Sequence, residues 1–140
     1  MPSLTLDPRL ERDSVHVVDL TLCQVRLSLD ARYPWLVLVP RRPDVTELFD
    51  LTQADQRTLW QEATALGQAM MQHFEGDKLN VATLGNVVAQ LHVHVIVRFA
   101  DDPAWPGPVW GHGEAERYAE AALKDRCDTI RRLAETLNVG

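Results

Sequence analysis

The residues of this sequence that are best suited to chemistry lie in the stretch QLHVHVI, residues 90–96. Polar and apolar side chains alternate there, which is the pattern of a β-strand with one apolar face. Gln90, His92 and His94 then share the other face, with successive side chains roughly 7 Å apart. In this arrangement one imidazole can attack a phosphorus atom while the other hydrogen-bonds the non-bridging oxygens. The stretch is therefore suited to covalent catalysis at a phosphate group.

Spacing alone leaves two other interpretations of the histidine pair open. A histidine in a strand is usually structural, so His92 and His94 can also be core residues. A His-x-His pair is a chelating geometry for zinc or copper as well, provided that a third ligand is nearby. The nearest candidates for that ligand all lie in the following loop: Asp101, Asp102 and His112. We expect neither a native metal site nor a cofactor.

Length and composition exclude several other classes of protein. The chain has 140 residues and a formal charge of −6, which suit one domain over residues 1–140 that does not bind nucleic acid. No apolar stretch approaches the length of a membrane span, and the N-terminus lacks the apolar segment of a signal peptide. Cys23 and Cys127 lie far apart and make no disulfide framework. We expect a cytoplasmic protein without a membrane partner, and small anionic ligands stay possible.

The histidine stretch must be positioned by the elements around it. Alternating apolar residues predict a strand over residues 17–30, with a bulge near Cys23 and Gln24, and a hairpin to a second buried strand over residues 35–43. Thr52 is a good N-cap for a long helix that Gly76 ends.

Two further strands with a tight turn between them and a C-terminal amphipathic helix follow, over residues 78–86, 89–99 and about 113–137. The turn between these strands is expected at Gly85-Asn86. The order of strand pair, helix, strand pair, loop and helix favours an α+β fold, in which helices pack on an antiparallel sheet.

Two longer stretches extend the pattern around the histidines. Residues 35–63, WLVLVPRRPDVTELFDLTQADQRTLWQEA, contain a buried strand, a Pro-basic turn and a helix that follows an acidic step, and residues 79–86 read LNVATLGN. Together with QLHVHVI they resemble the histidine triad (HIT) superfamily of nucleotide hydrolases and transferases, whose motif is His-φ-His-φ-His-φ-φ, with φ apolar. The match covers roughly residues 20–110. The resemblance implies a sheet of about five antiparallel strands with two main helices, and a homodimer formed through the long helix and the sheet edge.

The register of the motif on this chain can be set in two ways. Gln90 can replace the first histidine, which makes His92 the middle one. Alternatively His92 is the first histidine, so that His94 is the middle one and Ile96 replaces the third. We prefer the first register, because glutamine can make a polar contact whereas isoleucine cannot.

On that register the resemblance implies a role for each residue of the motif. Nε2 of His92 attacks the α-phosphate of a purine nucleotide and forms a nucleotidyl-histidine, which requires a neutral ring with its proton held on Nδ1 by a backbone carbonyl. His94 hydrogen-bonds the phosphate, and Gln90 stands where a histidine contacts the phosphate and the leaving group. Because glutamine is no acid near neutral pH, we expect slow turnover or a leaving group that is already acidic.

The resemblance assigns weaker roles to residues outside the motif. It implies that Asn80 and Asn86 contact phosphate and that Asp30 binds the ribose hydroxyls, although Asp30 also suits a simple turn. Trp35 falls near a position that is often histidine in relatives, where it can merely pack. The alternative function is a non-catalytic purine-nucleotide-binding protein of the same fold.

Overall fold

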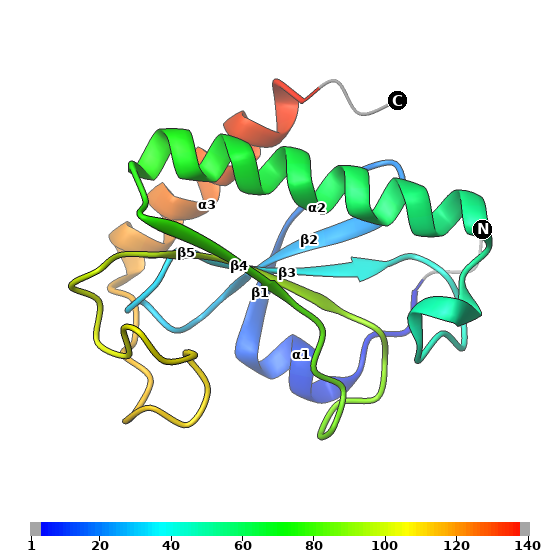
Figure 1. The fold of residues 1–140 in the computed structure, drawn as a ribbon, viewed down its shortest axis with the longest axis horizontal. Helices are drawn as coiled ribbons and strands as arrows, with labels where there is room; N and C mark the ends of the chain where they lie inside the picture. The colour runs from blue at the N-terminus through cyan, green and yellow to red at the C-terminus, as the bar shows by residue number, and fades with distance from the viewer. Residues whose placement is uncertain (1–3, 138–140) are drawn as a thin grey trace.

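The computed structural model of the protein describes residues 4–137 (Figure 1). Five antiparallel strands form one sheet in the order β1-β2-β3-β5-β4. The elements in chain order are α1 (Pro8–Asp13), β1 (Ser14–Asp19), β2 (Cys23–Ser28), β3 (Trp35–Pro40), the 3₁₀ turn η1 (Leu48–Asp50), α2 (Gln53–Phe74), β4 (Lys78–Ala82), β5 (Val93–Arg98) and α3 (Glu120–Glu135). The α+β fold with a five-stranded antiparallel sheet and two main helices is confirmed.

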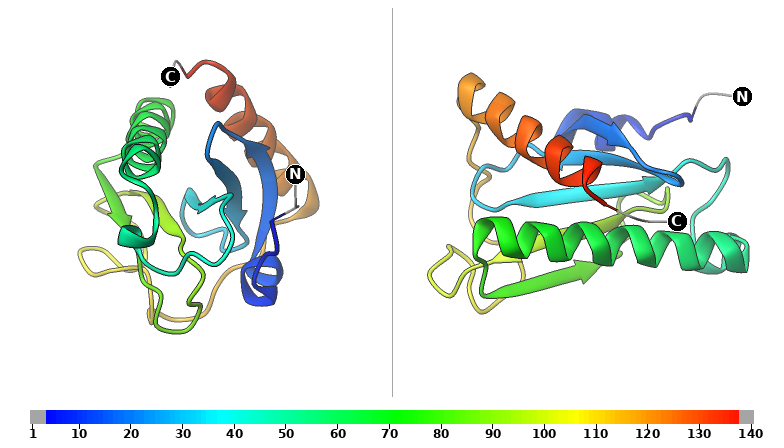
Figure 2. Two further views of the ribbon diagram at one scale, coloured as in Figure 1. Left: turned by 90° about the vertical axis from the view of Figure 1, so that its right-hand side faces the viewer. Right: turned by 90° about the horizontal axis from the view of Figure 1, so that it is seen from above.

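The two faces of the sheet are covered differently. Helices α2 and α3 lie on one face, and α1 with the N-terminal segment lies on the other (Figure 2). The main core fills the space beneath α2 and α3, and it takes alternate residues of the histidine stretch: Leu91, Val93, Val95 and Val97. The alternation in the sequence therefore assigned these side chains to the correct face, which leaves the histidines on the opposite one.

Helix α2 is defined by the residues at its two ends. The Thr52 hydroxyl accepts a hydrogen bond from the Asp55 N–H at 3.1 Å, so the predicted N-cap is confirmed. The left-handed residue at the other end is Glu75, with φ of 54°, and not Gly76. Gly76 is needed for a different reason, since a Cβ there would collide with the Val97 side chain.

The predicted strand over residues 17–30 is instead two strands, β1 and β2, joined by a short turn. The carboxylate of Glu62, which is fully buried on α2, accepts hydrogen bonds from the N–H groups of Leu22 and Cys23 at 2.9 Å each. The alternation predicted an irregularity near Cys23 and Gln24, next to this turn, but as a bulge, because the contact that holds the turn comes from a residue about 40 positions away.

Three other boundaries differ from the sequence-based expectation. Residues 83–92 form an extended loop, so β5 begins only at Val93 and the expected tight turn at Gly85-Asn86 is absent. Helix α3 begins at Glu120 instead of near residue 113, because the segment before it pairs with residues 30–31 through the Asp30–Arg117 bridge. Within the described residues, no helix is long and apolar enough to cross a membrane.

Candidate active site

His92 and His94 lie together on the sheet face that α1 covers. His94 is on β5, between Val37 of β3 and Ala82 of β4 in the sheet register, and His92 directly precedes the strand. Their ring centroids are 4.9 Å apart and the rings are nearly perpendicular, at 81°. Only 3% of His92 and 7% of His94 is exposed, so both rings are held in fixed positions by their surroundings.

The ring of His92 is oriented by the main chain of its own segment. Its Nδ1 lies 2.7 Å from the carbonyl oxygen of Gln90. A carbonyl oxygen only accepts, so Nδ1 carries the proton and the neutral ring keeps its lone pair on Nε2. The contact between Nδ1 and a backbone carbonyl that we expected for a nucleophilic histidine is present.

The ring of His94 is oriented by a side chain from the neighbouring strand. The indole N–H of Trp35 on β3 donates to Nδ1 of His94 at 2.9 Å. Trp110, from the loop after β5, packs against His94 with ring centroids 4.9 Å apart and against Trp35 at 5.9 Å. An indole N–H only donates, so the single proton of a neutral His94 sits on Nε2.

Burial keeps His94 neutral. Removal from water, and to a smaller degree the charge of the neighbouring His92, lower the pKa of His94 to about 3. His94 is therefore a hydrogen-bond donor through Nε2–H across the physiological pH range. The sequence did not indicate the two tryptophans as partners of His94, although the pairing of β3 with β5 would have placed Trp35 beside it.

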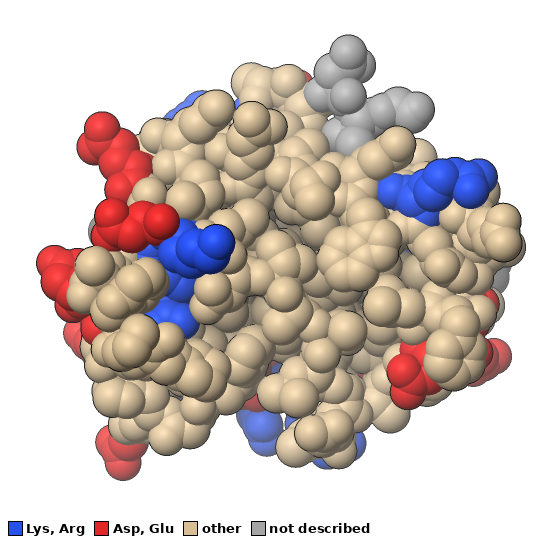
Figure 3. Space-filling model, in the orientation of Figure 1, with Lys and Arg blue, Asp and Glu red and all other residues tan. Residues whose placement is uncertain are grey.

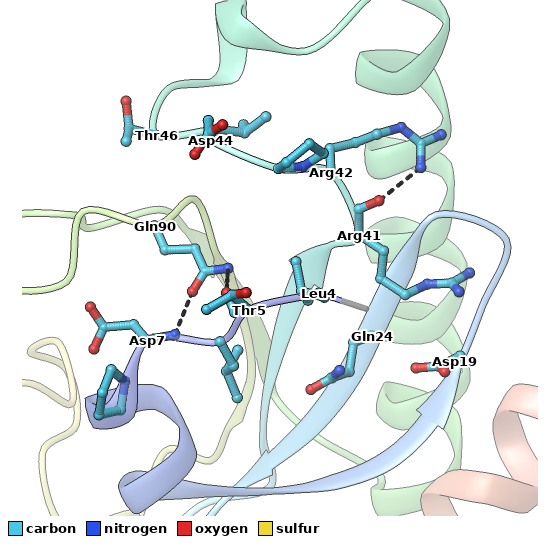
Figure 4. A pocket seen from close by; sticks show the side chains of 14 residues that line it. Leu4, Thr5, Asp7, Asp19, Gln24, Arg41, Arg42, Asp44, Thr46 and Gln90 are labelled. Carbon is cyan, nitrogen blue, oxygen red and sulfur yellow. Dashed lines mark hydrogen bonds between the residues drawn. The ribbon is translucent and has the colours of Figure 1, made fainter. Parts of the chain in front are cut away.

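The side chain of Gln90 binds the N-terminal segment. Its Oε1 accepts a hydrogen bond from the N–H of Asp7 at 2.7 Å, and its Nε2 donates to the carbonyl of Thr5 at 3.1 Å (Figure 4). The amide thus hydrogen-bonds to the backbone on both sides of Leu6, as the backbone of a neighbouring strand would. For the expected contact with phosphate and leaving group, the amide would have to release the N-terminal segment.

A cavity of about 820 Å³ lies beside this contact (Figure 4). The N-terminal segment over residues 4–8 and the loop over residues 41–46 line it, together with Gln90, but His92 and His94 do not. Its two arginines are engaged: Arg41 donates to main-chain carbonyls of the β1–β2 turn, and Arg42 pairs with Asp55 at 2.8 Å.

The family model of the HIT domain matches residues 9–101. The chain belongs to the HIT family. No match is found among curated proteins.

Three solved HIT proteins resemble the whole chain. One from Sinorhizobium meliloti 1021 is 46% identical, with a TM-score of 0.88 over 96% of this chain and 97% of its own. One from Marinobacter aquaeolei VT8 is 42% identical, with a TM-score of 0.93 over 97% and 99%. One from Bradyrhizobium japonicum is 41% identical, with a TM-score of 0.91 over 95% and 99%. Each is a histidine triad protein by description, which agrees with the fold found here.

The other residues implied by the HIT resemblance make no hydrogen bond to either histidine among the described residues. Asn80, on β4, accepts a hydrogen bond from Arg98 at 2.9 Å, and its amide N–H groups donate to no side chain or carbonyl within residues 4–137. Asn86 is exposed in the loop over residues 83–92. The oxygens of Asp30 are occupied by Arg32 at 2.9–3.2 Å and by backbone N–H groups.

The environment of Asp30 has a clear electrostatic consequence. Burial by itself would raise the pKa of Asp30, but the hydrogen bonds from Arg32 and from the backbone outweigh it and lower the pKa. Asp30 is thus an ionised carboxylate that is already paired, and a ribose would have to compete with Arg32 for it.

No three His, Cys, Asp or Glu side chains within residues 4–137 gather closely enough to hold a metal ion. Asp102, considered above as a third ligand, instead pairs with Arg98 at 2.7 Å, and both side chains are almost fully buried. In the part of the chain that the structure describes, no third His, Cys, Asp or Glu thus joins the histidine pair in a metal site.

Proposed function

We propose that this HIT protein is a nucleotidyl hydrolase or transferase that acts on a purine nucleotide through a nucleotidyl-His92 intermediate. The observation that supports this most directly is the 2.7 Å contact between His92 Nδ1 and the Gln90 carbonyl. It keeps the Nε2 lone pair available, beside a neutral His94 whose Nε2–H can hydrogen-bond a phosphate oxygen.

Each step of the proposed reaction conserves atoms and charge. The Nε2 lone pair of His92 forms a bond to the α-phosphorus, and the bond from phosphorus to the leaving group breaks with its electron pair. Water or another acceptor then attacks phosphorus, the N–P bond returns its electrons to Nε2, and the proton of the acceptor passes to solvent. His94 stabilises the charge that develops on the phosphate, a contribution of roughly 10²–10³-fold for one well-placed donor.

The same contacts support Gln90 as the first position of the motif. If His94 were the nucleophile, it would need its proton on Nδ1, but Nδ1 of His94 accepts from the Trp35 indole. His94 thus has no lone pair on Nε2, whereas His92 has one. We further propose that Asn80 and Asn86 contact the phosphates and that Asp30 reaches the ribose once Arg32 moves away.

We also propose that the protein is a cytoplasmic homodimer. Strand β4 is the outer strand of the sheet, and α2 carries no charged residue after Glu62. In Figure 3 the centre of the face formed by α2 and β4 is free of charged side chains. Trp60, on α2, is 40% exposed. An uncharged helix face beside a free strand edge is suited to pairing with a second copy.

The covalent intermediate provides the test. The protein is mixed with diadenosine polyphosphate, quenched within seconds in alkali, because phosphohistidine is acid-labile, and its intact mass is measured. We expect a mass increase of one adenylyl group, its absence in His92→Ala, and its retention in His73→Ala, an exposed histidine at the end of α2. An adduct that persists in His92→Ala would overturn the proposal. No adduct, with melting still raised by nucleotide, would favour the non-catalytic binding protein.

A further inference from the structure

We propose that this site transfers a nucleotidyl group only from donors whose leaving group departs without a proton from the protein. Carboxylates and phosphates, the leaving groups of acyl adenylates and phosphoanhydrides, meet this condition, whereas the amine of a phosphoramidate does not. The inference rests on the proposed transfer to His92 and names the substrate class of that site.

The proton on His94 is fixed by its hydrogen-bond partner. Trp35 donates to Nδ1, so the one proton of His94 is on Nε2. A neutral imidazole that gave up this proton would become an anion inside an apolar site, which is strongly disfavoured. His94 can therefore offer a hydrogen bond to an oxygen, but it cannot release a proton to a leaving group.

His94 does not acquire a second proton. Protonated Nδ1 would face the indole N–H of Trp35, so two donors would be 2.9 Å apart. Among the described residues, the aromatic and sheet-register neighbours of the ring carry no negative charge: His92, Trp35, Trp110, Val37 and Ala82. The lowered pKa of His94 agrees with this geometry.

Neither His92 nor Gln90 supplies the missing proton. The only proton of His92 is on Nδ1, bound to the Gln90 carbonyl on the side of the ring away from the attacking Nε2. Gln90 is not acidic, and its amide holds the N-terminal segment. Among the described residues no third His, Cys, Asp or Glu clusters with the two rings.

The consequence for substrates follows from the charge balance of the first transfer. When an acyl adenylate reacts, the P–O bond breaks and the carboxylate leaves as a stable anion, so no proton is needed. When a phosphoramidate reacts, the P–N bond must break toward an amine that needs a proton as it leaves. A positioned general acid typically accelerates a reaction by about 10²–10⁴-fold. At this site phosphoramidates react without that acceleration, whereas acyl adenylates do not need it.

Single-turnover kinetics test the inference. Formation of the His92 adduct is measured with acetyl adenylate and with adenosine 5′-phosphoramidate, each rate being divided by that of free imidazole with the same donor. We expect the normalised rate to be at least about 100-fold lower for the phosphoramidate. Equal normalised rates would overturn the inference and leave the proposed function intact, whereas no adduct from either donor would overturn both.

The role of Trp35 as a positioning residue has its own readout. Nitrogen-15 NMR of the wild-type protein should show an unprotonated Nδ1 and a protonated Nε2 on His94, and a protonated Nδ1 would contradict the inference without any activity measurement. In Trp35→Phe, Nδ1 of His94 loses its hydrogen-bond donor, so both tautomers of His94 are populated. The difference between the normalised rates for acetyl adenylate and adenosine 5′-phosphoramidate should then become smaller as the pH falls. Trp60→Phe, which alters an exposed indole on α2, should leave the two nitrogen signals of His94 and the difference between the normalised rates unchanged.

Discussion

His92 and His94 are neighbours on one sheet face, yet they are held in opposite ways. His92 is fixed by the carbonyl two residues before it, a contact within its own segment. His94 is fixed from another strand, by the indole of Trp35 and the packing of Trp110. The first arrangement exposes a lone pair on Nε2 and the second places a proton there. Two identical side chains 4.9 Å apart therefore acquire opposite chemical character, and the difference comes from their partners at Nδ1.

The largest expected effects come from removing each ring in turn. His92→Ala should abolish nucleotidyl transfer, because no other atom of the site carries the attacking lone pair. His94→Ala should lower kcat by about 10²–10³-fold, because it removes one donor to the phosphate while the nucleophile remains. Steady-state kinetics with diadenosine polyphosphate measure both. Equal losses in the two variants would mean that the distinction between nucleophile and donor is wrong.

The next effect concerns how folding depends on pH. The pKa of His94 is about 3 in the folded protein, against an ordinary value of 6.5 that the unfolded chain retains. As the pH falls below 6.5 the unfolded state binds the proton first, so stability is lost down to about pH 3, at up to about 1.4 kcal/mol per pH unit. Above pH 6.5, His94 does not change the dependence of stability on pH.

Urea unfolding between pH 7 and pH 4.5 checks this dependence. His94→Leu should lose stability less steeply over that range than the wild type, because its neutral side chain does not titrate. His73→Leu, which changes an exposed histidine, should follow the wild type. If the free energy of unfolding falls equally steeply with pH in His94→Leu and in the wild type, His94 is protonated in the folded state and is not the fixed donor described above.

The sequence was informative wherever a structure repeats locally. The alternation around His92 and His94 assigned both faces of β5, and Thr52 marked the start of α2 correctly. It was uninformative where a side chain reaches across the fold. The alternation predicted a bulge near Cys23 and Gln24, but not that Glu62 would hold a turn there between β1 and β2. The amide of Gln90 binds residues more than 80 positions away. Such contacts depend on how elements pack, and no local pattern encodes them.

A smaller effect is expected at Gln90, where the two possible roles of the side chain are separable. Gln90→Ala keeps the main-chain carbonyl that orients His92 but removes two hydrogen bonds to the N-terminal segment. We expect about 1–2 kcal/mol lower stability, with faster hydrogen exchange over residues 5–10 and a loss in kcat of less than about 10-fold. A loss of 100-fold or more, with exchange unchanged, would show that the amide contacts the substrate after all.

The smallest effect is expected at Arg9, which tests whether the N-terminal segment also holds the loop over residues 83–92. Arg9 donates to the carbonyl of Val87 at 2.9 Å, and half of its side chain is exposed. Because water can donate to that carbonyl in place of Arg9, Arg9→Ala should lower the free energy of unfolding by at most about 1 kcal/mol. Its effect should appear as faster exchange of amides near Val87, with the exchange of His94 and its strand unchanged. If exchange instead increases at His94 as well, the two histidines are not held independently, and the contrast between a locally fixed nucleophile and a distantly fixed donor would have to be abandoned.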